Sequence, residues 1–181
     1  MARKDSFPEQ PKRPTDAPTE RDVEYWLGIY KSIDEVPDRY LLSNYEAELS
    51  GEDTWSEYLS TRDDLAESTK KNSWNPCGDR FKQFMQEEVG RHHALPDPNN
   101  IESYLQHIKD GGYSIKVTER SLNTLYYQHF SPLKTFFSWL LHHTDYPHIY
   151  NPVLLAAHSR SITGETWYWQ TDYKPKYSNR E

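Results

Sequence analysis

One apolar pattern, between Leu122 and Leu140, constrains the fold of this 181-residue chain more than any other feature. Apolar residues and one histidine recur there every three or four positions and keep a single helical phase for about five turns, which predicts a long amphipathic helix. The stripe consists of Leu122, Leu125, Tyr126, His129, Leu133, Phe136, Phe137 and Leu140. Pro132 lies inside it, and Ser131 can cap a helix, so the pattern predicts either one long helix or two that meet at residues 130–132.

Two further stripes predict helices in the centre of the chain. The first has NPCG at its start, so Pro76 and Gly78 must be absorbed in the first turn of its helix or as a kink. For the second, Asp97 is suited to cap the helix, Pro98 to start it, and the glycine pair at Gly111 to stop it. The first stripe is Trp74, Cys77, Phe81, Phe84, Met85 and Val89, and the second is Ile101, Tyr104, Leu105 and Ile108.

The first part of the chain divides at about residue 18. Residues 1–18 hold four prolines among charged and small polar residues, a composition that predicts a disordered tail. Residues 19–54 predict a helical extension, with an amphipathic helix from Thr19 to Ile33 and a short helix over residues 39–49. A further helix is expected to begin at Thr54, where Glu57 completes a capping box.

The remaining segments add little regular structure. YSIKV, residues 113–117, predicts a short extended link, and a last helical turn is expected over residues 153–157. Because there is no internal repeat and no strand-like alternation, the predicted fold class is all-α. Seven residues are expected to share one core: Phe81, Phe84, Leu105, Leu133, Phe136, Phe137 and Leu140.

Composition limits what the chain can bind. With 28 acidic and 21 basic residues the net charge is −7, so overall charge does not attract nucleic acid or an anionic membrane, and any binding to a polyanion must be local. A single cysteine and an N-terminus without an apolar core indicate the cytoplasm. No apolar run approaches the roughly 20 residues that span a bilayer, which excludes a transmembrane protein.

Acidic residues are nevertheless missing from two stretches. Residues 120–144 carry none, although chance would place about four there. Residues 68–78 also carry none, and Lys70 and Lys71 stand there beside hydroxyl side chains at a helix start, a combination that suits phosphate. The alternative is that both stretches are ordinary solvated or internally packed helix faces. The polar face of the long pattern consists of Arg120, Thr124, Gln128, Ser131, Lys134, Thr135, Ser138 and His142.

SLNTLYYQHFSPLKTFFSWLLHHTDYPHIYNPVLLAA resembles the last helices of the SAM-like core-binding domain at the N-terminal side of tyrosine recombinases. The family pattern LSxLRxFFxWL, followed by a turn and NP, is met by Phe130, Ser131, Leu133, Lys134, Phe136, Phe137, Trp139, Leu140, Asn151 and Pro152. YLSTRDDLAESTKKNSW and NNIESYLQHI are similar to the first and second helices of that domain. The resemblance covers residues 55–158, and leaves residues 19–54 and the NPCG start without a family counterpart.

The resemblance implies a small orthogonal bundle of four to five helices at residues 55–158 that clamps duplex DNA. The implied DNA contacts are Thr69, Lys70, Lys71, Arg120, Ser131, Lys134 and Thr135. Lys134 is the best single candidate, although the family often has arginine there, which binds phosphate with two parallel hydrogen bonds. We expect Lys134 on the outer side of the long helix, with Lys70 and Lys71 converging on the same surface.

Catalysis is not expected. Strand cleavage in the family needs arginines, histidines and a tyrosine nucleophile in a separate domain, partly spelled His-x-x-Arg, a motif that this sequence lacks. The 23 residues after His158 are too few for that domain. No metal site is expected either, since the histidines at residues 92–93 and 142–148 lack the spacing of zinc ligands. No cofactor motif is present.

Two hypotheses therefore stand for function. The first is a DNA-binding, integrase-like protein that binds recombination sites, modulates a recombinase, or forms the N-terminal part of a longer enzyme. Its further partners would be a tyrosine recombinase or other copies of itself. The second is a helical protein-interaction module that does not bind DNA. Residues 159–181 are expected to be a tail or linker, whose Trp167 and Trp169 either pack on the helical body, which we favour, or stack on exposed bases.

Overall fold

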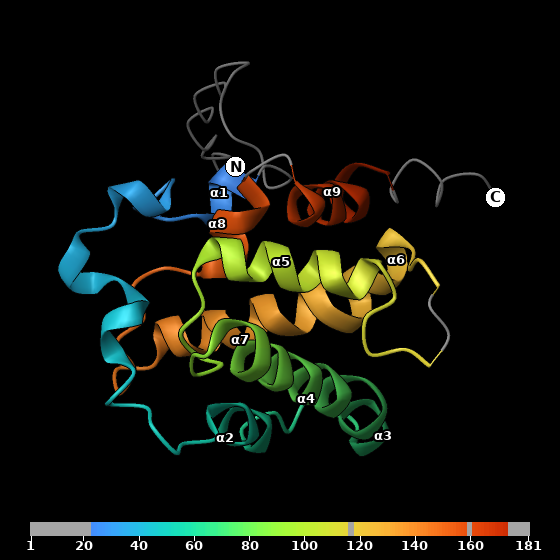
Figure 1. Ribbon diagram of the computed structural model, residues 1–181, viewed down its shortest axis with the longest axis horizontal. Helices are drawn as coiled ribbons and strands as arrows, with labels where there is room; N and C mark the ends of the chain where they lie inside the picture. Colours follow the sequence, from blue (N-terminus) through green and yellow to red (C-terminus); the bar gives the residue numbers. More distant parts are fainter. Residues whose placement is uncertain (1–22, 116–117, 159–160, 174–181) are drawn as a thin grey trace, which may run out of the picture.

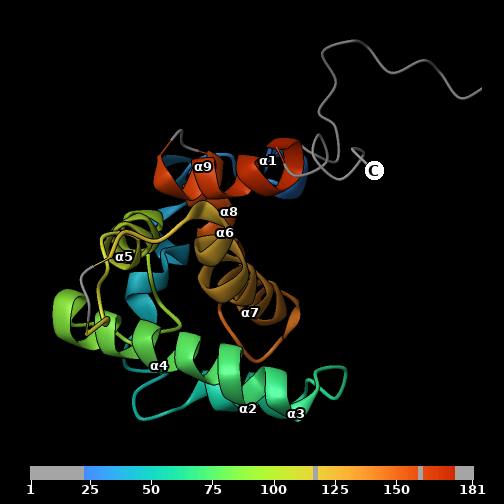
Figure 2. The same ribbon diagram turned by 90° about the vertical axis from the view of Figure 1, so that its right-hand side faces the viewer.

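The computed structural model describes residues 23–115, 118–158 and 161–173. These residues fold into helices and loops and contain no strand, so the predicted all-α class is confirmed. Two helices, α5 and α7, run side by side, and α4 crosses beneath them (Figures 1 and 2). Within the same residues no helix is long and apolar enough to cross a membrane.

The first long helix is continuous from Glu67 to Val89. It comprises α3 (Glu67–Thr69), the π-helical turn η4 (Lys70–Trp74), α4 (Asn75–Phe84) and a second π turn, η5 (Met85–Val89). Since Pro76 has no N–H to donate, the preceding Asn75 N–H reaches back to the Lys70 carbonyl, and the wider turn accommodates the proline. The expectation that NPCG begins this helix is therefore wrong.

The second long helix accommodates Pro132 in the same way. It comprises α6 (Leu122–Leu125), the π turn η6 (Tyr126–Phe130) and α7 (Ser131–His142), and the Ser131 N–H donates to the Tyr126 carbonyl. Ser131 has helical backbone angles and no capping role, so the pattern forms one helix rather than two. Its first cap is Ser121, whose hydroxyl accepts the Thr124 N–H.

Helix α5 (Pro98–Lys109) confirms its prediction in detail. The Asp97 side chain accepts the Asn100 N–H, and the Asn100 side chain accepts the Asp97 N–H, which completes a capping box. The four residues of its predicted stripe are buried. The helix gives way to a turn in which Gly111 adopts a positive φ of 91°.

Helix α2 (Thr54–Ser60) packs against α4 at a glycine. The Asp53 side chain, rather than the Thr54 hydroxyl, caps this helix by accepting the Ser56 N–H. A Cβ atom at Gly78 would overlap the indole of Trp55, so only glycine permits this approach. The ring of Trp55 then lies 4.9 Å from that of Phe136, which joins α2 to α7.

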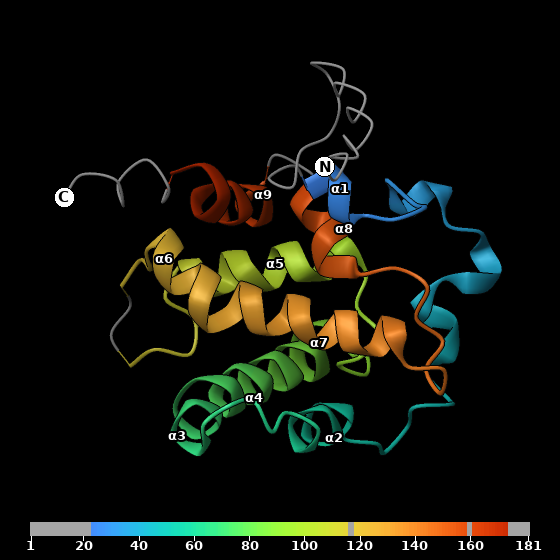
Figure 3. The same cartoon turned by 180° about the vertical axis from the view of Figure 1, so that it is seen from behind.

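The C-terminal part continues the helical body beyond residue 158. Helix α8 (Pro152–His158) is followed by α9 (Ile162–Tyr168) and a π turn, η7 (Trp169–Tyr173). Helix α9 contacts α5, α6 and α8 (Figure 3). Its Trp167 is buried against Phe130. Residues 161–173 therefore belong to the packed body, while residues 159–160 and 174–181 of the expected tail lie outside the described residues.

The N-terminal extension is less helical than predicted. Helix α1 (Val23–Trp26) ends two residues before Gly28, which has a φ of 72°, so the helix expected to reach Ile33 stops early. A short 3₁₀ turn, η1 (Ile33–Glu35), lies where that helix was expected to end. Two more 3₁₀ turns, η2 (Asp38–Tyr40) and η3 (Leu42–Tyr45), replace the helix expected over residues 39–49. The expected tail, residues 1–18, lies outside the described residues.

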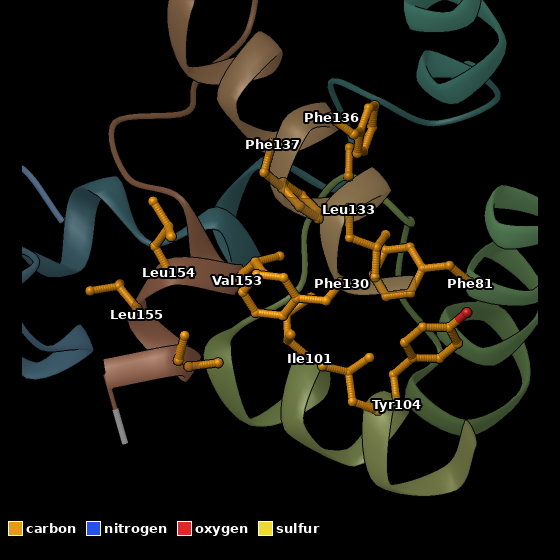
Figure 4. Packing of buried hydrophobic residues seen from close by; sticks show 14 of the residues in the cluster. Phe81, Ile101, Tyr104, Phe130, Leu133, Phe136, Phe137, Val153, Leu154 and Leu155 are labelled. Atoms are coloured by element: carbon orange, nitrogen blue, oxygen red, sulfur yellow. The ribbon is translucent and has the colours of Figure 1, made fainter. Parts of the chain in front are cut away.

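All seven predicted core residues are buried. In Figure 4, the Tyr104 ring points toward Phe81, and the Phe81 ring points toward Leu133, where α4, α5 and the second long helix meet. The Phe81 and Tyr104 rings lie 5.0 Å apart at an angle typical of edge-to-face aromatic pairs. The predicted core is therefore confirmed.

Candidate nucleic-acid interface

Thr69, Lys70 and Lys71 lie in the first turns of the first long helix. Thr69 and Lys71 are exposed, whereas Lys70 is half-buried and its Nζ lies 3.3 Å from a Glu67 oxygen. Lys71 has no acidic partner among the described residues. Of this group, Lys71 is the cation that is available to a ligand.

Lys134 does not lie on the outer side of its helix as expected. It is half-buried, its Nζ lies 5.1 Å from the centre of the Trp167 ring, and burial lowers its pKa. The Asn151 side chain donates to the Lys134 carbonyl and to the Ser138 hydroxyl, both at 3.0 Å. Helices α8 and α9 therefore cover this part of α7.

Ser131 and Thr135 belong to the same covered face. Both are half-buried, and the Thr135 hydroxyl donates to the Ser131 carbonyl at 2.8 Å, a bond within one helix. This hydroxyl is thus already bonded to backbone.

Arg120 holds the end of α5 rather than lying on the second long helix. Its Nη1 donates to the Ile108 carbonyl at 2.6 Å and to the Gly112 carbonyl at 3.0 Å. Burial, and then the charge of Arg80, lower the pKa of Arg120. Arg120 therefore has a structural role, which leaves part of its guanidinium unbonded.

The candidate residues do not converge on one surface. Helix α9, which covers Lys134, and α3, which precedes Lys70 and Lys71, lie on opposite sides of α7 in all three ribbon views (Figures 1–3). The expected convergence is therefore wrong. The missing acids have a simpler reason around Lys134, because a carboxylate in place of that lysine would be buried against Trp167.

Arg80 is a basic residue that the sequence patterns did not single out. It is half-buried on α4, between Cys77 and Phe81, and those two residues contact His129 and Tyr104 respectively. Its charge and that of Arg120 both act on Tyr104 and His129. In sequence Arg80 stands beside Asp79, so nothing there indicates an unpaired cation.

Three histidines are built into the core. The His129 Nδ1 lies 2.8 Å from the Tyr104 hydroxyl, the His93 Nε2 lies 2.9 Å from the Thr54 hydroxyl, and the His148 Nε2 lies 2.7 Å from the Ala94 carbonyl. Burial lowers the pKa of His93 and His129 to about 3 and that of His148 to about 4. In the described parts of the chain no three histidine, cysteine or acidic side chains are grouped to hold a metal ion.

Comparison with known proteins gives no match to a family model, to a curated protein or to a solved structure.

Proposed function

We propose that the helical body is a DNA-binding domain of the kind found at the N-terminal side of tyrosine recombinases. It would hold duplex DNA through the phosphate backbone, in DNA integration or recombination or in their regulation, without catalysis of its own. Backbone contacts position a protein on DNA without reading its sequence.

The observation that carries this proposal is the order and packing of the helices. The long helix from Glu67, α5, the long helix from Leu122 and α8 follow one another in the order that the resemblance implies, and they enclose the core that the apolar stripes predict. The Asn-Pro pair has a structural role: the Asn151 side chain accepts the Val153 N–H at the start of α8 and also holds α7. Both parts of the motif thus act in one junction.

The contact surface that we propose differs from the one expected from sequence. The described residues carry twice as many acidic as basic side chains, so DNA must meet a local cluster. Lys134 is covered, and Lys70 is paired with Glu67. The exposed Thr69 and Lys71 remain as candidates at the helix start.

A protein-interaction module is the second candidate, and one observation favours it. Ile29 is 88% exposed and Trp26 is 52% exposed at the end of α1, on a body that is acidic overall. Trp26 and Ile29 are three positions apart in sequence, and patches of exposed apolar side chains mark contact sites for other proteins.

Titration of short fluorescent duplex DNA with the full chain separates the two candidates. Phosphate contact predicts binding at about 50 mM salt that weakens steeply as salt is raised, with similar affinity for unrelated duplexes. Absence of binding at low salt would leave the protein-interaction module as the better account.

Catalysis is tested separately with a suicide-nicked duplex that traps covalent intermediates. We expect no covalent protein–DNA adduct from this chain alone. A trapped adduct would contradict the proposed division between binding and catalysis.

A further inference from the structure

We infer that Arg80 and Arg120 form a binding site for a phosphate group, where α4 meets the end of α5 and the turn η6. The inference rests on the proposed function only for the source of that phosphate, which is then the DNA backbone.

Contacts on either side of Arg80 fix its position. The Cys77 Sγ lies 3.9 Å from the His129 carbonyl on η6, and the Phe81 ring lies 5.0 Å from that of Tyr104 on α5. Arg120 is bonded to the carbonyl of Ile108, one turn beyond Tyr104 on α5. Arg80 therefore lies on the face of α4 that packs against α5 and η6, and its charge and that of Arg120 act on the hydrogen-bonded pair of Tyr104 and His129 and on one another.

Neither arginine has a carboxylate partner among the described residues, whereas five other cations of the helical body do. The paired cations are Arg62 with Asp64, Lys70 with Glu67, Lys82 with Asp53, Arg91 with Asp97, and Lys109 with Glu119. Arg80 makes no hydrogen bond or ion pair with a described residue, and Arg120 bonds only to carbonyls. Two half-buried like charges without a counterion are unfavourable, and an anion between them would reverse that cost.

The unbonded nitrogens suit a phosphate. Both hydrogen bonds of the Arg120 guanidinium come from Nη1, so its Nε and Nη2 are unbonded within the described chain, as are all the nitrogens of Arg80. A guanidinium presents parallel N–H groups that match two phosphate oxygens, an arrangement that lysine does not offer. The ordinary chemistry of arginine therefore favours a phosphate ester or inorganic phosphate at this site.

Arg80 is the better residue for a test, because Arg120 also holds the end of α5. Arg39 is the matched control: it is exposed on η2 in the N-terminal extension, far from α6, and has no carboxylate partner among the residues described (Figure 1). One arm measures duplex binding by full-length Arg80→Gln, Arg80→Glu, Arg39→Gln and Arg39→Glu. The other arm measures the melting temperature of wild type, Arg80→Gln and Arg39→Gln in phosphate and in chloride at equal ionic strength.

We expect Arg80→Glu to weaken duplex binding about tenfold and Arg80→Gln to reduce the salt slope by about one, with much smaller effects at Arg39. If the site takes free phosphate instead, phosphate will raise the melting temperature of wild type and Arg39→Gln but not of Arg80→Gln. Equal behaviour of the Arg80 and Arg39 variants in both arms would overturn the inference. Failure of wild type to bind any duplex would refute the proposed function. The melting temperatures in phosphate would then decide whether Arg80 and Arg120 bind a phosphate group.

Discussion

The Lys134 ammonium lies 5.1 Å from the centre of the Trp167 ring, so the cation that looked most suited to DNA is instead stacked on a buried tryptophan of α9. Cation–π contacts of this kind contribute about 0.5–2 kcal/mol, depending on how far the cation is removed from water. The acid-free face of α7 is thus, in part, a packing surface.

Charge reversal at Lys134 should destabilise the protein. Lys134→Glu would place a carboxylate against Trp167 and should lower the free energy of unfolding by about 1–3 kcal/mol, measured by urea denaturation. Lys134→Met keeps the apolar stem and is the control, with an expected loss below about 1 kcal/mol. Equal stability of Lys134→Glu and wild type would show that the side chain is solvated.

Gly78 should not tolerate alanine. The added Cβ would overlap the Trp55 indole, so Gly78→Ala should cost about 1–3 kcal/mol of stability in thermal or urea unfolding, despite the better helix propensity of alanine. In a Trp55→Phe background the same substitution should cost less, because the smaller ring leaves more room. An identical loss of stability in both backgrounds would show that the loss does not come from overlap with the Trp55 indole.

Acid should destabilise the fold well above the pKa range of the carboxylates. His93, His129 and His148 have pKa values lowered by burial to about 3, 3 and 4, against an unfolded value near 6.5. The unfolded state therefore binds more protons between about pH 3 and 6.5, and stability falls as the pH falls through that window.

At pH 5.5 the expected loss, relative to pH 7.5, is roughly 1 kcal/mol for each of these histidines. Urea denaturation at the two pH values measures it. The variant His93→Asn should show a smaller pH dependence. A stability that is constant from pH 7.5 to 5.5 would contradict the burial of neutral histidines.

Phe136 should be among the most costly residues to truncate. It is fully buried and packs against the rings of Trp55 and Tyr58, so Phe136→Ala should lower the free energy of unfolding by roughly 3–5 kcal/mol. Ile115, which is fully exposed, provides the control, and Ile115→Ala should change stability by less than about 0.5 kcal/mol. A loss below about 1 kcal/mol at Phe136 would place this residue outside the core.

Local signals were enough to predict helix α5 and the core stripe. The start and end of α5 depend on Asp97, Pro98 and Gly111, whose effects are confined to residues next to them in sequence. An apolar stripe at helical spacing can be buried only on one side of its helix. The π turns before Pro76 and Pro132 were harder to predict, because such a turn depends on packing that keeps the helix intact on both sides of the proline. Such packing involves residues far away in sequence.

Long-range contacts also explain the other errors. The 3₁₀ turn η3 is held where the Tyr150 hydroxyl accepts the Leu42 N–H, across 108 positions of sequence. The cover over Lys134 comes from Trp167, and Arg80, although it stands beside Asp79 in sequence, has no ion pair with a described residue. None of these relationships leaves a periodic or compositional trace.

The most direct test of the account is the dependence of duplex affinity on salt, for wild type, Lys134→Gln and the double variant Lys71→Gln with Arg80→Gln. We predict that wild type binds, that Lys134→Gln keeps its salt slope, and that the double variant loses about two units of that slope, one for each lost phosphate contact. A wild-type chain that does not bind, or a double variant with an unchanged slope, would contradict the claim that this acidic body holds DNA through Lys71 and Arg80.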